Sequence, residues 1–253
     1  MLEVKNLNVS IGESEVLGDI SLEVKTGERV GIIGPNGHGK SVTLKTISGL
    51  FKPKRGEILF EGKNLLRLAP KEIVESGITL VPEGGHLFPE MTVFENLLLG
   101  AYTPEARRRR DQSLERVYSL FPKLKELHRQ KCNALSGGEL RMAAVARGLM
   151  TCPKLLMLDE PTLGLAPNLV EAMGQKLYEL VKGQEENYRK AGEKELSIIL
   201  ADENIDLMAD VADRVYFIEN GRIRLEGGTK EVLANDYVRK TYLGIDEEGQ
   251  ERR

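Results

Sequence analysis

The sequence contains only two cysteines, Cys132 and Cys152, and neither belongs to a CxxC pair or a Cys/His cluster. This argues against both a disulfide scaffold and a cysteine-based zinc site. No apolar run approaches the ~18 residues that span a bilayer. The opening MLEVKNLNVS also lacks the basic-then-apolar pattern of a signal peptide. We therefore expect a soluble, cytoplasmic chain in which both cysteines are free thiols.

An excess of positive charge is also absent. Lys and Arg number 36 against 39 Asp and Glu, which gives a net charge of -3. Proteins that bind the phosphate backbone of nucleic acids usually carry a basic excess, so we expect no nucleic-acid partner. With 253 residues, the chain is long enough for one large α/β domain with a substantial core.

Apolar patterns predict strands in the first and last thirds of the chain, and a helical pattern extends from Thr92 to about Met150. The expected strands are 2–9, 20–24, 29–33, 57–61, 78–81, 155–158, 197–201, 214–219 and 222–226. The dipeptide Asn220-Gly221 accepts positive φ and favours a type I′ hairpin between the last two strands. Purely apolar strands that alternate with helices predict a parallel sheet.

A glycine-rich loop follows the strand 29–33. Residues 34–41, GPNGHGKS, fit the pattern G-x-x-x-x-G-K-[ST] between a strand and a helix, which is the context the motif requires. Its backbone N–H groups can point into one concavity, to which His38 is expected to lend only its own N–H. Lys40 would reach the β- and γ-phosphates, and Ser41 would offer a hydroxyl to Mg²⁺. The sequence therefore predicts a phosphate cradle.

Two carboxylates, Asp159 and Glu160, follow the apolar strand 155–158. The carboxyl edge of a parallel sheet is where ligand sites of α/β proteins lie. Asp159 can hold the Mg²⁺ shell, and Glu160 can orient or deprotonate the water that attacks the γ-phosphate. Alone, such a pair could be a strand-end cap. Beside the phosphate cradle, the catalytic interpretation is favoured.

A second phosphate-binding helix start is predicted at residues 135–139, LSGGE, where Ser136 can cap the helix and two glycines permit close approach of a phosphate. The order GPNGHGKS, LSGGE, LLMLDEPT resembles the ABC ATPases across essentially the whole chain, and LSGGE closely matches their signature motif. In that family two subunits pack head to tail. The resemblance implies that residues 136–139 contact the γ-phosphate held by the partner subunit's Lys40. ATP would then join the dimer, and hydrolysis would open it.

Within the family, the segments VPEGGHLFPEMTVFENL, DEPTLGLAP and VLANDYVRKTYLG are similar to the ATP-binding subunits of branched-chain amino-acid importers. This resemblance implies a second ATPase subunit, two integral membrane permease subunits, an extracytoplasmic solute-binding protein that acts indirectly, and a place on the inner face of the cell membrane. Whether the ATPase dimer is homo- or heteromeric stays open.

The fold implied by the resemblance is α/β: a RecA-like P-loop NTPase core with an N-terminal antiparallel β subdomain and an inserted α-helical subdomain. Residues 1–253 would form a single ABC ATPase domain. Its core lobe would comprise about 1–88 and 151–253, and its helical lobe about 89–150. The helical lobe would touch the membrane subunits.

Three positions depart from the family pattern. Ile11 stands where an aromatic side chain usually stacks on adenine, and it gives up a stacking energy of roughly 1 kcal/mol. Glu83 replaces a Gln, although a carboxylate can still ligate Mg²⁺. Glu203 occupies a position that normally holds His. Its charge would repel the γ-phosphate and slow hydrolysis, unless the side chain points away from the phosphate.

The expected site has three groups of residues. Glu160 and Glu203 are the catalytic candidates. The candidate metal ligands are Ser41, Glu83 and Asp159. The candidate nucleotide-binding residues are Ile11, Val16, Gly34, Pro35, Asn36, Gly37, His38, Gly39, Lys40, Ser41, Val42, Ser136, Gly137, Gly138 and Glu139.

The expected reaction is hydrolysis of Mg-ATP to ADP and phosphate at a dimer interface, coupled to uptake of branched-chain amino acids or a related polar small solute. Two other functions compete with it. A soluble ABC factor of translation or DNA repair usually has two ATPase halves or a long coiled-coil insertion, and this sequence has neither. A nucleotide-gated clamp that binds ATP with little turnover would be consistent with Ile11 and Glu203.

Overall fold

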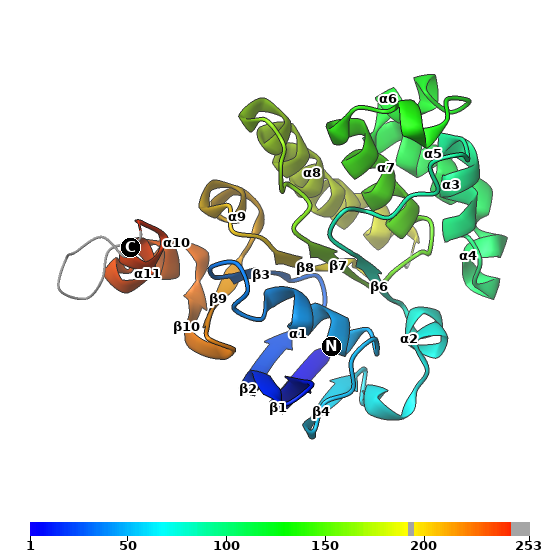
Figure 1. The fold of residues 1–253 in the computed structure, drawn as a ribbon. Coiled ribbons are helices and arrows are strands. Elements are labelled where there is room, and N and C mark those ends of the chain that lie inside the picture. Colours follow the sequence, from blue (N-terminus) through cyan, green and yellow to red (C-terminus); the bar gives the residue numbers. More distant parts are fainter. Residues whose placement is uncertain (192–194, 244–253) are drawn as a thin grey trace.

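Two β-sheets form the framework of the molecule. The computed structural model describes residues 1–191 and 195–243. An antiparallel sheet has the strand order β2-β1-β4-β5, and a six-stranded sheet has the order β10-β9-β3-β8-β7-β6 (Figure 1). The strands are β1 (Leu2–Ile11), β2 (Ser14–Val24), β3 (Arg29–Ile33), β4 (Arg55–Phe60), β5 (Lys63–Asn64), β6 (Ile78–Val81), β7 (Leu155–Asp159), β8 (Ser197–Ala201), β9 (Arg214–Glu219) and β10 (Arg222–Gly228).

The six-stranded sheet is parallel except at one edge. β3 pairs in parallel with β8 and β9, and β7 pairs in parallel with β6 and β8. β10 returns antiparallel to β9 through Asn220 (φ 50°) and Gly221 (φ 70°), which confirms the expected hairpin. Because parallel strands end at one edge of a sheet, the loops after β3, β7 and β8 lie together.

Helices flank the sheets, and those from α3 to α7 gather at the upper right of Figure 1. The pattern from Thr92 to about Met150 predicted an α-rich region, and the structure divides this region into several short helices. Two of them begin at Pro104 and Pro122, because proline has no N–H for a helix interior but fits its first turn. The helices are α1 (Lys40–Ile47), η1 (Leu65–Arg67), α2 (Pro70–Ser76), α3 (Val93–Gly100), α4 (Pro104–Arg108), α5 (Arg110–Leu120), α6 (Pro122–Glu126), η2 (Cys132–Ala134), α7 (Gly137–Leu149), α8 (Pro167–Ala191), α9 (Ile205–Val211), α10 (Thr229–Ala234) and α11 (Asp236–Leu243).

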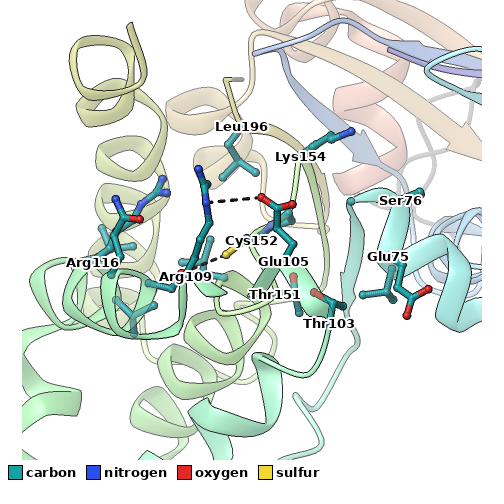
Figure 2. Close-up of a pocket in the computed structure, with 18 residues that line it drawn as sticks. Glu75, Ser76, Thr103, Glu105, Arg109, Arg116, Thr151, Cys152, Lys154 and Leu196 are labelled. Atoms are coloured by element: carbon teal, nitrogen blue, oxygen red, sulfur yellow. Dashed lines mark hydrogen bonds and ion pairs between the residues drawn. The ribbon is translucent and has the colours of Figure 1, made fainter. Parts of the chain in front are cut away.

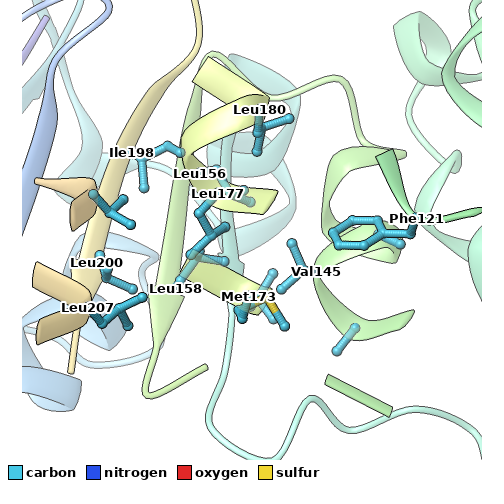
Figure 3. Close-up of a cluster of buried hydrophobic side chains, with 14 of the residues drawn as sticks. Phe121, Val145, Leu156, Leu158, Met173, Leu177, Leu180, Ile198, Leu200 and Leu207 are labelled. Atoms are coloured by element: carbon cyan, nitrogen blue, oxygen red, sulfur yellow. The ribbon is translucent and has the colours of Figure 1, made fainter. Parts of the chain in front are cut away.

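The six-stranded sheet is buried on both faces. On one face, residues of β7 and β8 pack with side chains of α7, α8 and α9 (Figure 3). Alternate residues of the same strands pack with α1 and the antiparallel sheet. The first set includes Leu156, Leu158, Ile198 and Leu200, and the second includes Leu155, Met157, Ile199 and Ala201. Burial on both faces explains why these strands are continuous apolar runs in the sequence.

The α/β class, with an antiparallel sheet near the N-terminus and a helical insertion, is confirmed. The division into lobes at about residues 88 and 150 stays a prediction. Within residues 1–191 and 195–243, no helix has both the length and the apolar character that crossing a membrane requires.

Candidate functional site

The phosphate cradle connects the end of β3 to the start of α1. Gly34 has φ 152°, and a Cβ at this position would lie 2.0 Å from the carbonyl oxygen of Ile218 in β9. Gly39 is left-handed, with φ 108°, and forms the N-cap of α1. A Cβ on Gly39 would lie 2.5 Å from the side chain of Leu17. Only glycine fits both positions, so these two motif glycines are required by packing as well as by φ.

Lys40 is folded back into the cradle. Its ammonium donates to the carbonyl oxygens of Gly34 at 2.8 Å and Pro35 at 3.3 Å, and it lies 3.5 Å from Oδ1 of Asn36. It also lies 3.3 Å from Oε1 of Glu160. The lysine therefore occupies the centre of the loop, at the place where the motif requires a cation for the phosphates.

Ser41 and Asp159 lie in contact across the sheet edge. The Ser41 hydroxyl donates to Oδ1 of Asp159 at 2.8 Å. Oδ2 of Asp159 is buried and has no hydrogen-bond partner among the described residues, and the Lys45 ammonium is 4.0 Å away. Burial raises the pKa of the Asp159 carboxyl, although the Ser41 hydrogen bond and the Lys45 charge oppose this. A buried, unpartnered carboxylate oxygen is costly unless another ligand completes it.

This donor set fits Mg²⁺. A hydroxyl and a carboxylate are oxygen ligands, and Mg²⁺ bound with a nucleotide takes one or two such protein ligands and draws the rest from phosphates and water. The described residues contain no cluster of three His, Cys, Asp or Glu side chains placed to hold a metal. Ser41 and Asp159 would therefore hold Mg²⁺ together with a bound nucleotide.

Glu160 has a backbone conformation that few side chains adopt. Its φ is 47°, and its N–H donates to the carbonyl oxygen of Ala201 at 2.7 Å. Burial raises the pKa of its carboxyl, while the charge and hydrogen bond of Lys40 act in the opposite direction. An observed left-handed residue at a site costs energy and supports a functional interpretation of that residue.

Asp202 and Glu203 follow β8 at the same edge of the sheet. Asp202 is buried and accepts hydrogen bonds from the Thr162 hydroxyl at 2.7 Å and the Asn204 N–H at 3.0 Å. Glu203 is half-buried. Asp202, which was not among the candidates predicted from the sequence, is thus the acid that organises this loop. No local signal could have indicated this bond, because its partners come from the DEPT and ADEN segments, 40 positions apart.

The signature segment forms a capped helix start. Ser136 is the N-cap of α7, and Oε2 of Glu139 accepts from both its N–H and its hydroxyl at 2.8 Å. Gly137 is exposed, and a Cβ there would meet no described atom within 4 Å, whereas Gly138 is buried against Leu169. Within the described residues, no hydrogen bond or ion pair joins this segment to the cradle of the same chain.

The remaining candidates surround the cradle. Ile11 is 47 % exposed at the end of β1. The Val16 carbonyl lies beside both Gly39 and Gly221. Val42 lies in α1 and is partly buried against the core between α1 and the two sheets. The His38 ring accepts the Asn220 N–H at 3.2 Å through Nδ1, a side-chain contact that was not expected, and the His38 N–H donates to the Pro35 carbonyl oxygen at 3.3 Å.

Glu83 lies in the exposed loop after β6. Its negative charge contributes to the raised pKa of both Asp159 and Glu160, so it faces the same site. A further contact was not expected from the sequence. The Gly34 N–H donates to the hydroxyl of Tyr242, in α11, at 2.8 Å. No local pattern could have indicated it.

A separate cavity of about 400 Å³ lies away from this site (Figure 2). It is lined by residues from α2, α5 and the segments just before β6 and β7, which places it at the amino edge of the sheet. Arg109 and Glu105 form an ion pair at 3.6 Å beside it. Because the cradle and the acidic residues lie at the carboxyl edge, this cavity has no part in phosphate chemistry.

The geometry agrees with comparisons to known proteins. The sequence pattern of the family described as "ABC transporter" matches residues 17–163, which include the cradle, the signature segment and Glu160. The chain belongs to this family. It is an ATP-binding ABC ATPase, and such subunits dimerise and work with membrane permease subunits.

Several relatives match over nearly full length. The chain is 39 % identical to the high-affinity branched-chain amino acid transport ATP-binding protein BraG of Pseudomonas aeruginosa, over 96 % of this chain and 100 % of the relative. It is 31 % identical to the probable branched-chain amino acid transport ATP-binding protein LivF of Archaeoglobus fulgidus, over 97 % and 99 %. It is 30 % identical to the lipopolysaccharide export system ATP-binding protein LptB of Haemophilus influenzae, over 96 % and 97 %.

Solved structures show the same fold. A nucleotide-free ATP-binding cassette from an ABC transporter matches with a TM-score of 0.79 at 29 % identity, over 98 % of this chain and 99 % of that chain. An ATP-binding cassette in its ADP conformation matches with a TM-score of 0.78 at 29 % identity, over 96 % and 98 %. The expected P-loop NTPase fold is therefore confirmed.

Proposed function

We propose that this ABC ATPase powers an importer of branched-chain amino acids or a related polar small solute. The observation that carries the ATPase chemistry is the convergence of Lys40, Ser41, Asp159 and Glu160 at one sheet edge. The importer assignment is supported by the relatives. The BraG match is 39 % identical, whereas the match to an export-system protein is 30 % identical.

In the proposed reaction, the cradle binds the phosphates of ATP through its backbone N–H groups. The Lys40 ammonium leaves the Gly34 carbonyl and binds the β- and γ-phosphates. Ser41 and Asp159 would hold Mg²⁺, with Glu83 adding a carboxylate from the facing loop, and the metal would neutralise phosphate charge. The main rearrangement in this scheme is the movement of Lys40 from the Gly34 carbonyl to the phosphates.

Glu160 would act on water. A water oxygen attacks the γ-phosphorus, the bond to the β–γ bridging oxygen breaks, and the proton of the water passes to the Glu160 carboxylate. Burial raises the pKa of this carboxyl and thereby makes its ionised form a stronger base. Glu203 would lie near the γ-phosphate, and its negative charge would slow turnover.

The second ATPase subunit would complete the site. Gly137, the first residue of α7, is exposed, whereas the Ser136 N–H is bonded to Glu139, and a helix N-terminus attracts an anion. We place the γ-phosphate held by the partner's Lys40 against residues 136–139. Binding of ATP would then close the dimer, and hydrolysis would release it.

The permease would bind an apolar groove beside the helical insertion. This groove, of about 350 Å³, is lined by residues between the end of β6 and helices α3 and α7. Its rim includes Leu50, Phe88, Leu99 and Tyr102, whose exposed fractions lie between 41 and 58 %. Exposed apolar side chains gathered around one groove are typical of a protein interface. A cytoplasmic helix of the permease is the proposed occupant, which would hold the chain at the inner face of the membrane.

The ATPase assignment is tested by phosphate release from Mg-ATP at increasing protein concentration. A rate per subunit that rises with concentration and is abolished by Glu160→Gln is expected of a dimeric ATPase. Absence of release above the level of that variant would instead favour the nucleotide-gated clamp.

The importer assignment needs a separate test. Cells that lack the chain are expected to lose uptake of labelled leucine, and the native chain but not Glu160→Gln should restore it. Unchanged uptake would overturn the importer assignment while leaving the ATPase assignment intact.

A further inference from the structure

The C-terminal helix α11 is anchored to β9, the strand on which the phosphate cradle rests. The Tyr237 ring packs edge-to-face on Phe217, with centroids 5.9 Å apart, and the Tyr237 hydroxyl donates to the Glu219 carboxylate. Val238 is completely buried. The ring contact and the burial of Val238, neither of which needs the Tyr237 hydroxyl, fix the first turns of α11 against the sheet and thereby determine where its last turn lies.

From that last turn, Tyr242 reaches the first residue of the cradle. The Gly34 N–H donates to the Tyr242 hydroxyl at 2.8 Å, while the Gly34 carbonyl accepts from Lys40 at 2.8 Å. The Cα of Gly34 faces Ile218, where even a methyl group would collide with the backbone. Gly34 is thus held on three sides, and Tyr242 supplies the only side-chain acceptor that the described residues offer its N–H.

The two side-chain contacts of Gly34 differ in what ATP does to them. Lys40 must leave the Gly34 carbonyl to bind phosphates. The N–H bonded to Tyr242 is not needed for that step, so this hydrogen bond can persist with the nucleotide bound. Tyr242 would then be the contact that keeps the entry of the loop in place while Lys40 moves.

The hydroxyl of Tyr242 also lies near the loop after β8. Burial raises its pKa well above the ordinary value, and the negative charges of Glu203 and Asp202 add to this effect. The hydroxyl therefore remains neutral at physiological pH and keeps its proton while it accepts from Gly34. It is placed between the cradle and the loop that follows the catalytic strands.

We propose that Tyr242 is a positioning residue that holds the phosphate cradle in its binding conformation, so that helix α11 sets the affinity for nucleotide. This rests on the proposed function of the cradle. Tyr242 touches the loop backbone and not the reacting atoms, so its effect is on binding. ADP and ATP bind to the same loop, whose first residue Tyr242 holds in place. The affinities for both nucleotides should therefore change together.

The test compares Tyr242→Phe with Tyr237→Phe. Each variant loses one hydroxyl from the same helix and keeps its ring, but the Tyr242 hydroxyl bonds to Gly34 of the cradle, whereas the Tyr237 hydroxyl bonds to Glu219 of β9. We expect Tyr242→Phe to weaken binding of MgADP and of Mg-ATPγS by about fivefold, the size of one hydrogen bond, as measured by calorimetry. Hydrogen exchange in a peptide covering residues 30–39 should become faster. Tyr237→Phe should stay within about twofold of the native chain for both nucleotides.

Native affinity for both nucleotides in Tyr242→Phe would overturn the proposal, and so would an equal loss in the two variants, which would indicate a general effect on α11. A native chain that bound neither nucleotide would contradict the proposed function itself. If Tyr242→Phe did not fold, the Gly34 amide of the native chain decides: slow exchange supports the proposal, and exchange as fast as in an open loop refutes it.

Discussion

The Lys40 ammonium lies 3.3 Å from the Glu160 carboxylate, and the two side chains are only 2 % and 9 % exposed. A buried charge is stable when it is paired, so each group satisfies the other before a nucleotide binds. Phosphates that draw Lys40 away would leave Glu160 as a buried carboxylate with a raised pKa. The Glu160 carboxylate thus stays paired with the Lys40 ammonium until the substrate is present.

Glu160→Gln is expected to reduce turnover at least ~100-fold, because an amide of the same shape cannot take the proton of the attacking water. ATP binding should be retained, because Glu160 acts on the attacking water rather than on the phosphates, and the ATP-bound dimer should accumulate. Single-turnover phosphate release and size-exclusion chromatography with Mg-ATP measure both effects. Turnover close to that of the native chain would mean that another group is the base.

Asp159→Asn is expected to stabilise the nucleotide-free chain at pH 8. The raised pKa of Asp159 means that the folded state favours its protonated form, so its contribution to stability is lost as pH rises through that pKa. Asn cannot ionise and keeps an oxygen for the Ser41 hydroxyl. The gain should be on the order of 1 kcal/mol at pH 8 and should shrink as the pH falls towards 4. Thermal melts across this range measure it.

Asp213→Asn provides the control of opposite sign. Burial acts to raise the pKa of the Asp213 carboxyl. The hydrogen bonds and charge of Arg29 nevertheless hold this pKa below its ordinary value. Its stabilising contribution is present at neutral pH and is lost as the pH falls through that pKa. This variant should therefore be less stable than the native chain at pH 8. If the stability gained by Asp159→Asn increased at low pH, the Asp159 carboxyl could not have a raised pKa in the folded chain.

The placement of the acidic residues was predictable because it depends on local pattern. The apolar run 155–158 forms β7, and parallel strands share a carboxyl edge, so a phosphate-loop motif after one strand locates the carboxylates after another. The capping box at Ser136 and Glu139 is equally local, since its partners are three residues apart.

Contacts between distant segments were not predictable. Gly34 and Tyr242 are 208 positions apart, and their hydrogen bond exists because α11 packs on β9. Nothing in the pattern around Tyr242 distinguishes a buried hydroxyl from an exposed one. Asp202 was not predicted for the same reason, because its partner Thr162 lies on another loop and the sequence draws attention to the unusual Glu203.

Leu99→Glu is expected to weaken binding to the permease at least several-fold while leaving basal hydrolysis within about twofold, because a charge at an apolar interface costs affinity. Leu66→Glu is the matched control, since Leu66 is similarly exposed but lies in η1, outside the groove. Co-purification with the permease and phosphate release measure the two properties. Equal retention of the permease by both variants would show that the groove is not the docking surface.

Glu203→Gln is expected to tighten ATP binding about tenfold without changing ADP affinity, because it removes a negative charge that would face only the γ-phosphate. Glu203 is half-buried beside the buried Asp202, so the site screens this charge incompletely. Parallel titrations with Mg-ATPγS and MgADP separate the two cases. Unchanged affinity for both nucleotides would support the alternative that Glu203 points away from the phosphate.

Gly34→Ala should be far more damaging than Gly37→Ala, although both glycines belong to the same motif. A Cβ at Gly34 would lie 2.0 Å from the Ile218 carbonyl oxygen, whereas Gly37 has φ 79° and open space around that position. Gly37→Ala should therefore cost only the ~1 kcal/mol of a left-handed alanine. Gly34→Ala must displace the loop from β9, which should cost more than ~2 kcal/mol and abolish MgADP binding. Melting temperatures and calorimetry on both variants test this, and equal losses would mean that φ alone, rather than the contact with β9, makes glycine necessary in the cradle.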